Sequence, residues 1–192
     1  MADKRTMIKK AFIEMIGKMP IESVRTEELL KRAEVSKTTF YRTFRDKYDV
    51  MNSVYMDVSS QMVERTYDLA NWKEWTLHDL ENVKAHKTFF RNIISYEGQN
   101  SFQEVTGHFF QTNMLRQVRN REEGREPSEE IRFLVEAFAR VNVFTLVWWI
   151  RGDCQVPPDR VVEYVEESIP PRLRKYFEPE PEAGSAKSGQ DG

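Results

Sequence analysis

The chain has 192 residues, 40% of them hydrophobic and 31% charged, which is enough apolar material to build a core and enough charge to keep it soluble. Its single cysteine excludes an intramolecular disulfide framework and fits a reducing cytoplasm. The net charge of −2 is spread unevenly along the chain. Residues 1–50 carry twelve basic and eight acidic side chains, whereas residues 51–192 carry seventeen basic and twenty-three acidic ones. A basic N-terminal part joined to an acidic remainder is compatible with DNA binding.

The first predicted helix covers residues 7–16. Its apolar residues recur at three- and four-residue steps, and Gly17 and Pro20 end it. No apolar core of about 7–15 residues follows the charged start of the chain, so a secretory signal is not expected.

Three further helices follow within the first half of the chain. We expect Thr26 to cap a short second helix, Ser36 to cap a third that runs to about Phe44, and Asp46 to cap a long fourth. The second helix opens with two glutamates, which are favourable at the positive end of a helix dipole.

Beyond residue 71 the pattern predicts helices at 75–95, with a break near His86, then at 102–121, at 128–151, and from Pro158 onward. The stretch 131–150 is the most apolar, but charged residues interrupt it, so we expect a buried helix and no membrane span. No strand or internal repeat is evident.

The fold class is therefore predicted to be all-α. Residues 1–46 form a three-helix helix-turn-helix unit, and a long fourth helix joins it to a helical regulatory and dimerisation body over residues 47–177. Residues 178–192 are rich in proline, glycine and serine and are expected to be a disordered tail.

The informative motif spans residues 26–50, where two short helices meet at a turn around Glu34 and Val35. Ala33 is small because the helices nearly touch there, and Phe40 and Phe44 face the core. The outward residue types can reach bases and phosphates in a major groove. The alternative is a helical hairpin without a DNA role.

This motif resembles the signature of the TetR (tetracycline-repressor-like) family. The matching residues, in step, are Ala33, Val35, Ser36, Thr39, Phe40, Tyr41, Phe44 and Lys47. The resemblance covers about the first fifty residues. Further along, only the general plan is similar, an all-α body that ends in two dimerising helices.

The resemblance implies double-stranded operator DNA as the partner and repression as the default activity. By position, Thr26 and Lys47 would hold phosphates, and Tyr41 would contact the DNA backbone. The residues expected to face bases are Lys37, Thr38, Thr39, Arg42 and Thr43.

Two residues depart from the family pattern. Glu34 replaces the usual turn glycine, so a residue with a side chain must adopt the turn geometry, with strain if its φ is positive. It also brings a negative charge close to DNA. Arg25 stands where a small hydroxyl residue is common, and its side chain could hold a phosphate.

An apolar stripe along residues 128–151 predicts a homodimer, because the stripe is too large for one small body to hide. Two copies of this helix and of the last helix could close a four-helix bundle about a two-fold axis. The expected interface residues are Val141, Phe144, Thr145, Trp148, Val161 and Val165.

The resemblance also implies a pocket in the body for a small effector that releases DNA. The many aromatic residues after residue 71 favour an apolar or aromatic ligand, although the rings could simply fill the core. The residues expected to line the pocket are His86, Phe89, Phe90, Phe109, Asn113 and Gln117.

Other functions receive little support. His78, His86 and His108 have no spacing typical of a metal site, and neither metal nor cofactor is expected. Cys154 could sense redox state, but a lone cysteine in a turn is usually inert. No nucleophile–base constellation is evident, so an enzyme is not expected. The competing class is a dimeric coactivator or interaction protein that does not itself bind DNA.

Overall fold

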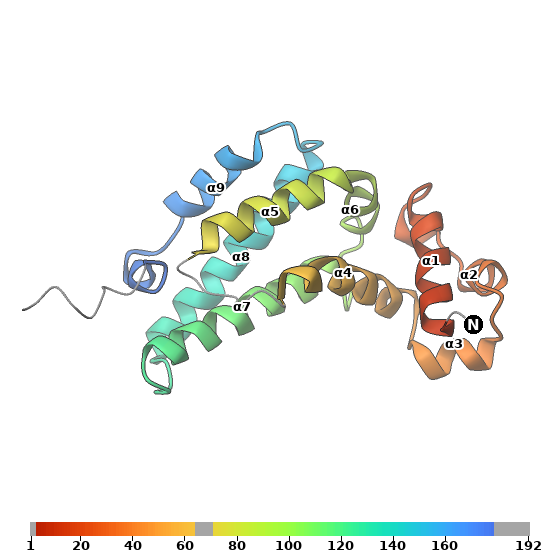
Figure 1. Ribbon diagram of the computed structural model, residues 1–192, viewed down its shortest axis with the longest axis horizontal. Helices are drawn as coiled ribbons and strands as arrows, with labels where there is room; N and C mark the ends of the chain where they lie inside the picture. Colours follow the sequence, from red (N-terminus) through yellow and green to blue (C-terminus); the bar gives the residue numbers. More distant parts are fainter. Residues whose placement is uncertain (1–2, 64–70, 179–192) are drawn as a thin grey trace, which may run out of the picture.

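The computed structural model describes residues 3–63 and 71–178, without the side chains of 58–63, and every regular element in these ranges is helical (Figure 1). The predicted all-α fold is confirmed. The predicted tail lies, from residue 179 on, outside the described residues. The elements are α1 (Lys4–Ile16), η1 (Ile21–Ser23), α2 (Thr26–Arg32), α3 (Lys37–Thr43), α4 (Lys47–Val63), α5 (Trp72–Ala85), α6 (Lys87–Ile93), α7 (Phe102–Arg121), α8 (Glu129–Arg151), α9 (Pro158–Glu167) and η3 (Pro171–Tyr176).

Helices α1, α2 and α3 form a small unit at one end of an elongated molecule (Figure 1). Its core takes Phe12 from α1, Leu29 from α2 and Phe40 from α3, and all three side chains are completely buried. Burial of such large apolar side chains is the main force that holds short helices together, since helices of seven residues are not stable alone.

Side-chain caps fix several helix starts where the sequence predicts them. The Ser36 hydroxyl accepts a hydrogen bond from the Thr39 N–H (3.2 Å), and the Ser128 hydroxyl accepts one from Ile131 (3.3 Å). Asp46 accepts from the first turn of α4. The prediction for Thr26 was wrong: Arg25 occupies the cap position without a side-chain bond, and Thr26 is the first helical residue.

Helix α4 connects the small unit to the body. Toward the small unit, Ser53 of α4 accepts a hydrogen bond from Arg5 of α1 (2.7 Å), and Asp57 of α4 pairs with Lys9 of α1 (2.6 Å). On the other side, Tyr55 packs edge-on against Phe102 of α7 (ring centroids 4.9 Å apart). A single helix therefore has contacts with both parts of the molecule.

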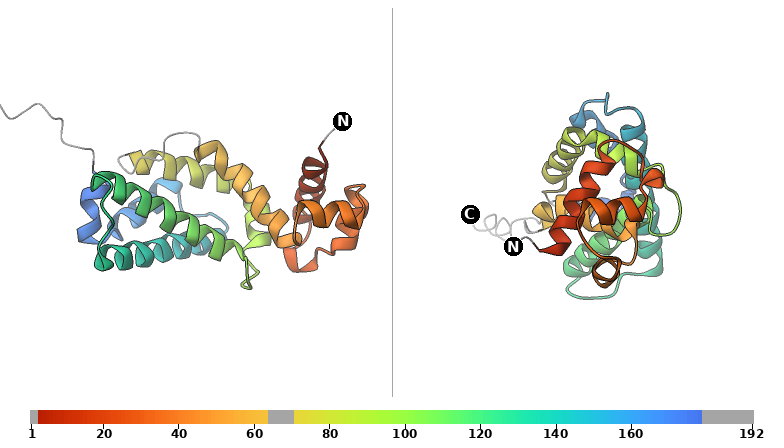
Figure 2. Two further views of the ribbon diagram at one scale, coloured as in Figure 1. Left: turned by 90° about the horizontal axis from the view of Figure 1, so that it is seen from below. Right: turned by 90° about the vertical axis from the view of Figure 1, so that its right-hand side faces the viewer.

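The body is a layered helical bundle (Figure 2). Helices α7 and α8 pack along each other as its longest pair, α9 packs against α5 and α8, and η3 covers the end remote from α1–α3. The break predicted near His86 is confirmed: its backbone leaves the helical region (φ −112°), and this residue separates α5 from α6.

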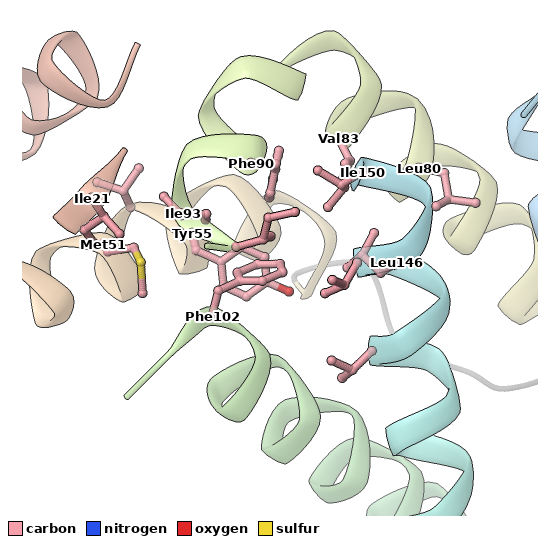
Figure 3. Packing of buried hydrophobic residues seen from close by; sticks show 14 of the residues in the cluster. Ile21, Met51, Tyr55, Leu80, Val83, Phe90, Ile93, Phe102, Leu146 and Ile150 are labelled. Atoms are coloured by element: carbon pink, nitrogen blue, oxygen red, sulfur yellow. The ribbon is translucent and has the colours of Figure 1, made fainter. Parts of the chain in front are cut away.

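Helix α8 is buried along one face and exposed along the other. By length and composition it alone, among the described helices, could cross a membrane, but half of its apolar window is buried inside the protein. Leu146 and Ile150 point into a cluster with Phe90 and Phe102 (Figure 3). Such burial is typical of a core helix in a globular protein.

Candidate functional site

The turn between α2 and α3 contains one residue in the left-handed backbone conformation. Glu34 has φ of 52°, and the N–H groups of Glu34 and Val35 donate to Lys31 (3.3 Å) and Leu30 (3.1 Å). This pairing is the Schellman ending of a helix, which usually places glycine at this position. The positive φ meets the condition under which strain at Glu34 is expected, because the Cβ atom of a non-glycine residue disfavours this conformation.

One face of α3 presents unused polar side chains to solvent. Lys37, Thr38 and Arg42 are exposed, and no hydrogen bond or ion pair holds them within the described part of the chain. Tyr41 is 52% exposed, with its ring against the edge of Phe40. Three donor types and an aromatic hydroxyl on one short helix form a face that could contact DNA.

Two predicted base contacts are already engaged in the helix itself. The Thr39 hydroxyl lies 2.9 Å from that of Ser36, and the Thr43 hydroxyl donates to the Thr39 carbonyl (2.9 Å). Both side chains are half-buried. Thr26 lies half-buried at the start of α2.

The phosphate role expected of Lys47 does not fit its contacts. The ammonium group donates to the carbonyl oxygens of Ile21 (2.8 Å), Glu22 (3.1 Å) and Val24 (2.9 Å). An ammonium has three donors, so all are used. Partial burial lowers the pKa of Lys47, against smaller opposing effects of Glu22 and Asp46. Lys47 therefore joins α4 to the η1 turn.

Other basic residues flank α3. Arg25 and Arg45 are exposed on either side of it, and the guanidinium of Arg5 stacks over the Phe44 ring at 4.8 Å. Sequence reasoning missed Arg5 and Arg45. The basic start of the chain was a signal for Arg5, but its place beside the end of α3 depends on tertiary packing.

An apolar stripe on α8 faces solvent. Phe133, Phe144 and Trp148 are 68%, 69% and 43% exposed, and Val141 lies between them. Tyr164 of α9 extends the stripe, with its ring 6.3 Å from that of Trp148. Sequence analysis missed Phe133 and Tyr164, although the spacing of Phe133 from Val141 and Phe144 places all three on one helix face.

Three residues expected at the dimer interface lie inside the protomer instead. Val161 and Val165 are buried because the apolar face of α9 packs on α5 and α8 of its own chain. Thr145 is also buried, and its hydroxyl donates to the Val141 carbonyl (2.9 Å).

The six residues expected to line an effector pocket lie in different environments. His86 is exposed at the end of α5, and Phe90 is fully packed. The Asn113 amide is satisfied, since it donates to Phe109 (2.8 Å) and accepts from Arg116 (2.9 Å). Phe89 and Gln117 are half-buried. None of the six lines either of the cavities described next.

Two hollows occur in the described part of the body. An open groove of about 690 Å³ follows α7 and α8 and borders Phe144 and Trp148. A small internal cavity of about 30 Å³ lies between α5, α7, α8 and α9. Half of its ten lining residues are aromatic, and Asp79 supplies a carboxylate.

Cys154 has the environment of a structural cysteine. Its thiol is buried, and burial, with the neighbouring Asp153 carboxylate, raises its pKa. A raised pKa reduces the thiolate fraction on which oxidation depends. The geometry thus disfavours redox sensing at this position.

Comparisons with known proteins agree with this architecture. Residues 8–54 match the family model of bacterial regulatory proteins of the tetR family, and residues 70–170 match that of a transcriptional regulator C-terminal region. No curated protein matches the chain.

Solved structures share the fold at low sequence identity. The dihydroxyacetone kinase operon activator DhaS is 13% identical, with a TM-score of 0.60 over 90% of this chain and 97% of its own. A tetR-family transcriptional regulator from Streptomyces coelicolor is 13% identical, with a TM-score of 0.60 over 87% of this chain and 80% of its own. A TetR transcriptional regulator from Rhodococcus sp. RHA1 is 16% identical, with a TM-score of 0.56 over 91% of this chain and 96% of its own.

The two family models together cover both parts of the molecule, and the second alone spans more than half of the chain. The helix-turn-helix unit and the helical body described above are the parts to which these models correspond. The chain therefore belongs to the TetR family of bacterial transcriptional regulators.

Proposed function

We propose that this regulator acts in the cytoplasm as a homodimer that binds double-stranded operator DNA through α3 of each protomer. Residues 1–46 are the DNA-binding unit and residues 47–177 the regulatory body. The observation that carries this proposal is the solvent-facing row of Lys37, Thr38, Tyr41 and Arg42, whose polar groups are largely free for a partner.

The contacts between the two parts support control by an effector. The Asn92 amide of α6 donates to the Ile16 carbonyl at the end of α1 (2.7 Å), and Ser95 donates to Glu22 (2.9 Å). Tyr48 of α4 stacks on Tyr96 at 4.0 Å. A ligand that binds the body better in the DNA-free conformation would move these contacts and separate the recognition helices from their half-sites.

A gel shift with DNA from upstream of its own coding sequence tests the proposal. Arg42→Ala is expected to weaken operator binding by about 1–3 kcal/mol and to relax specificity at one base pair. Lys84→Ala removes an exposed cation from α5 and should leave binding unchanged. Unaltered binding by Arg42→Ala would show that α3 does not read the operator through this face.

The sign of regulation is a separate question. DhaS, which shares the fold, is named an operon activator. We propose repression as the activity of this chain, and transcription from its operator should fall when the protein is added. If no DNA is bound at physiological salt, the chain would instead be a dimeric interaction protein.

A further inference from the structure

One wall of the small cavity carries the carboxylate of Asp79, a half-buried residue. No hydrogen bond or ion pair reaches Asp79 of α5 from any described residue. Burial raises the pKa of this carboxyl to about 7. An unpartnered acid in an apolar wall is unfavourable for folding, whereas a neutral side chain of similar size would not be.

The rest of the wall combines aromatic and aliphatic side chains with the neutral polar side chains of Thr76 and Asn142. Trp72 and Phe138 each meet the Phe177 ring edge-on, at 5.8 and 5.7 Å. No second charged residue lines the cavity in the described part of the chain. Two charged residues of the flanking helices, Lys73 of α5 and Glu166 of α9, pair with each other.

This combination has a definite chemical preference. Aromatic ring faces attract cations, and a carboxylate supplies the opposite charge, so a positive group that enters the cavity meets favourable electrostatics on several sides. A neutral ligand would leave the Asp79 carboxylate without an opposite charge, and an anion would be repelled.

Phe177 is one of the less buried aromatic walls of the cavity. It follows η3 near the end of the described chain and is half-buried, whereas Trp72 and Phe138 are 4% and 1% exposed. The cavity holds about 30 Å³, close to the room of one water molecule. A larger ligand must therefore displace part of the wall, and we expect the Phe177 ring to give way because it follows the last helical turn of the body.

We propose that this cavity binds the ammonium group of an organic cation, with Asp79 as its counter-charge and with the apolar part of the ligand in the place of Phe177. The inference rests on the proposed function only in that such a cation would be the effector. The site itself depends on the contacts of Asp79 and Phe177.

Calorimetric titration with two matched probes tests the site. Phenethylamine is positively charged near neutral pH, and phenethyl alcohol is a neutral molecule of similar shape. We expect Phe177→Ala to bind the amine about tenfold or more tightly than the alcohol at about pH 8, and the wild type to show the same preference with weaker binding.

Two variants of α5 assign that preference. Asp79→Asn should fold, because it removes an unpartnered charge, and should lose the preference for the amine. Glu81→Gln removes an exposed carboxylate from the same helix and should keep it. The preference should also fall by about tenfold per pH unit below the pKa of Asp79, as protonation removes the charge.

Three results would overturn the inference: no binding of the amine to Phe177→Ala, equal binding of amine and alcohol, or a preference that survives Asp79→Asn. A gel shift without probe examines the proposed function separately. If the protein binds operator DNA but shows no preference for the amine, the cation site is rejected and the proposed DNA-binding function is kept. If it prefers the amine but does not bind operator DNA, the cation site is kept and the proposed DNA-binding function is rejected.

Discussion

Glu34 combines two unfavourable features at the helix-turn-helix. Its left-handed backbone (φ 52°) is strained for a residue with a side chain, and its carboxylate lies at the turn next to α3. Glu34→Gly is expected to raise the free energy of unfolding by about 0.5–2 kcal/mol, because glycine adopts this conformation without strain. Urea unfolding at fixed protein concentration measures this.

Glu34→Gln separates charge from conformation. Glutamine keeps the strained backbone, so the stability of this variant should stay near that of the wild type. The operator affinity of both Glu34→Gln and Glu34→Gly should rise, because each removes one negative charge near the DNA phosphates. A glutamine variant as stable as the glycine variant would show that strain at this turn is negligible.

Asp79 should make stability depend on pH. Its pKa in the folded protein is about 7, above its ordinary value of 3.8, so the folded state holds the proton more tightly. The unfolding free energy of the wild type should therefore fall as pH rises from about 4 to about 7, by about 1–4 kcal/mol relative to Asp79→Asn. Parallel pH profiles of the two proteins would show that the carboxyl is not buried in solution.

At the scale of elements, Lys47 ties the start of α4 to η1. Lys47→Met keeps most of the apolar stem but removes the donors to Ile21, Glu22 and Val24. We expect a loss of about 1.5–3 kcal/mol of stability, because hydrogen bonds from a charged group are stronger than neutral ones. Thermal unfolding would measure this loss.

Lys37→Met is the matched control, since Lys37 is exposed at the start of α3. That variant should keep wild-type stability and bind operator DNA more weakly. If Lys47→Met instead kept its stability and flattened the salt dependence of DNA binding, Lys47 would hold a phosphate after all.

Most helices of this fold are predictable because their signals are local. Ser36 and Ser128 cap helices that also show apolar periodicity, and the break at His86 follows from the end of such a pattern. The short elements η1 and η3 were not predicted, because one or two turns of 3₁₀ helix show no clear periodic pattern and form through contacts with the rest of the fold.

The candidate site residues were predictable only where their positions depend on a single helix. The exposed row on α3 follows from the spacing of its residues. The contacts of Lys47 join segments more than twenty residues apart, and the cavity at Asp79 forms from four helices and a C-terminal ring. Likewise, the inward direction of Val161 depends on how α9 packs, which periodicity alone does not determine.

At the scale of the whole molecule, the exposed stripe on α8 predicts the oligomeric state. Phe133, Phe144 and Trp148 present large apolar surfaces to solvent, and the groove along α7 and α8 runs beside them. A protomer alone leaves this surface in water, whereas a second copy related by a two-fold axis would cover it with the same residues.

Phe144→Glu should therefore break the dimer. A buried charge at the centre of the stripe would have no partner, and a loss of about 2–4 kcal/mol in association corresponds to a dissociation constant about 30- to 1,000-fold higher. Sedimentation at micromolar concentration should show a monomer. Ile13→Glu places the same charge on α1, where Ile13 is 47% exposed, and should stay dimeric.

Because a monomer presents one recognition helix to one half-site, Phe144→Glu should also lose operator affinity although α3 is unchanged. A wild-type protein that sediments as a monomer, or a Phe144→Glu variant that remains a dimer, would place the interface on another face.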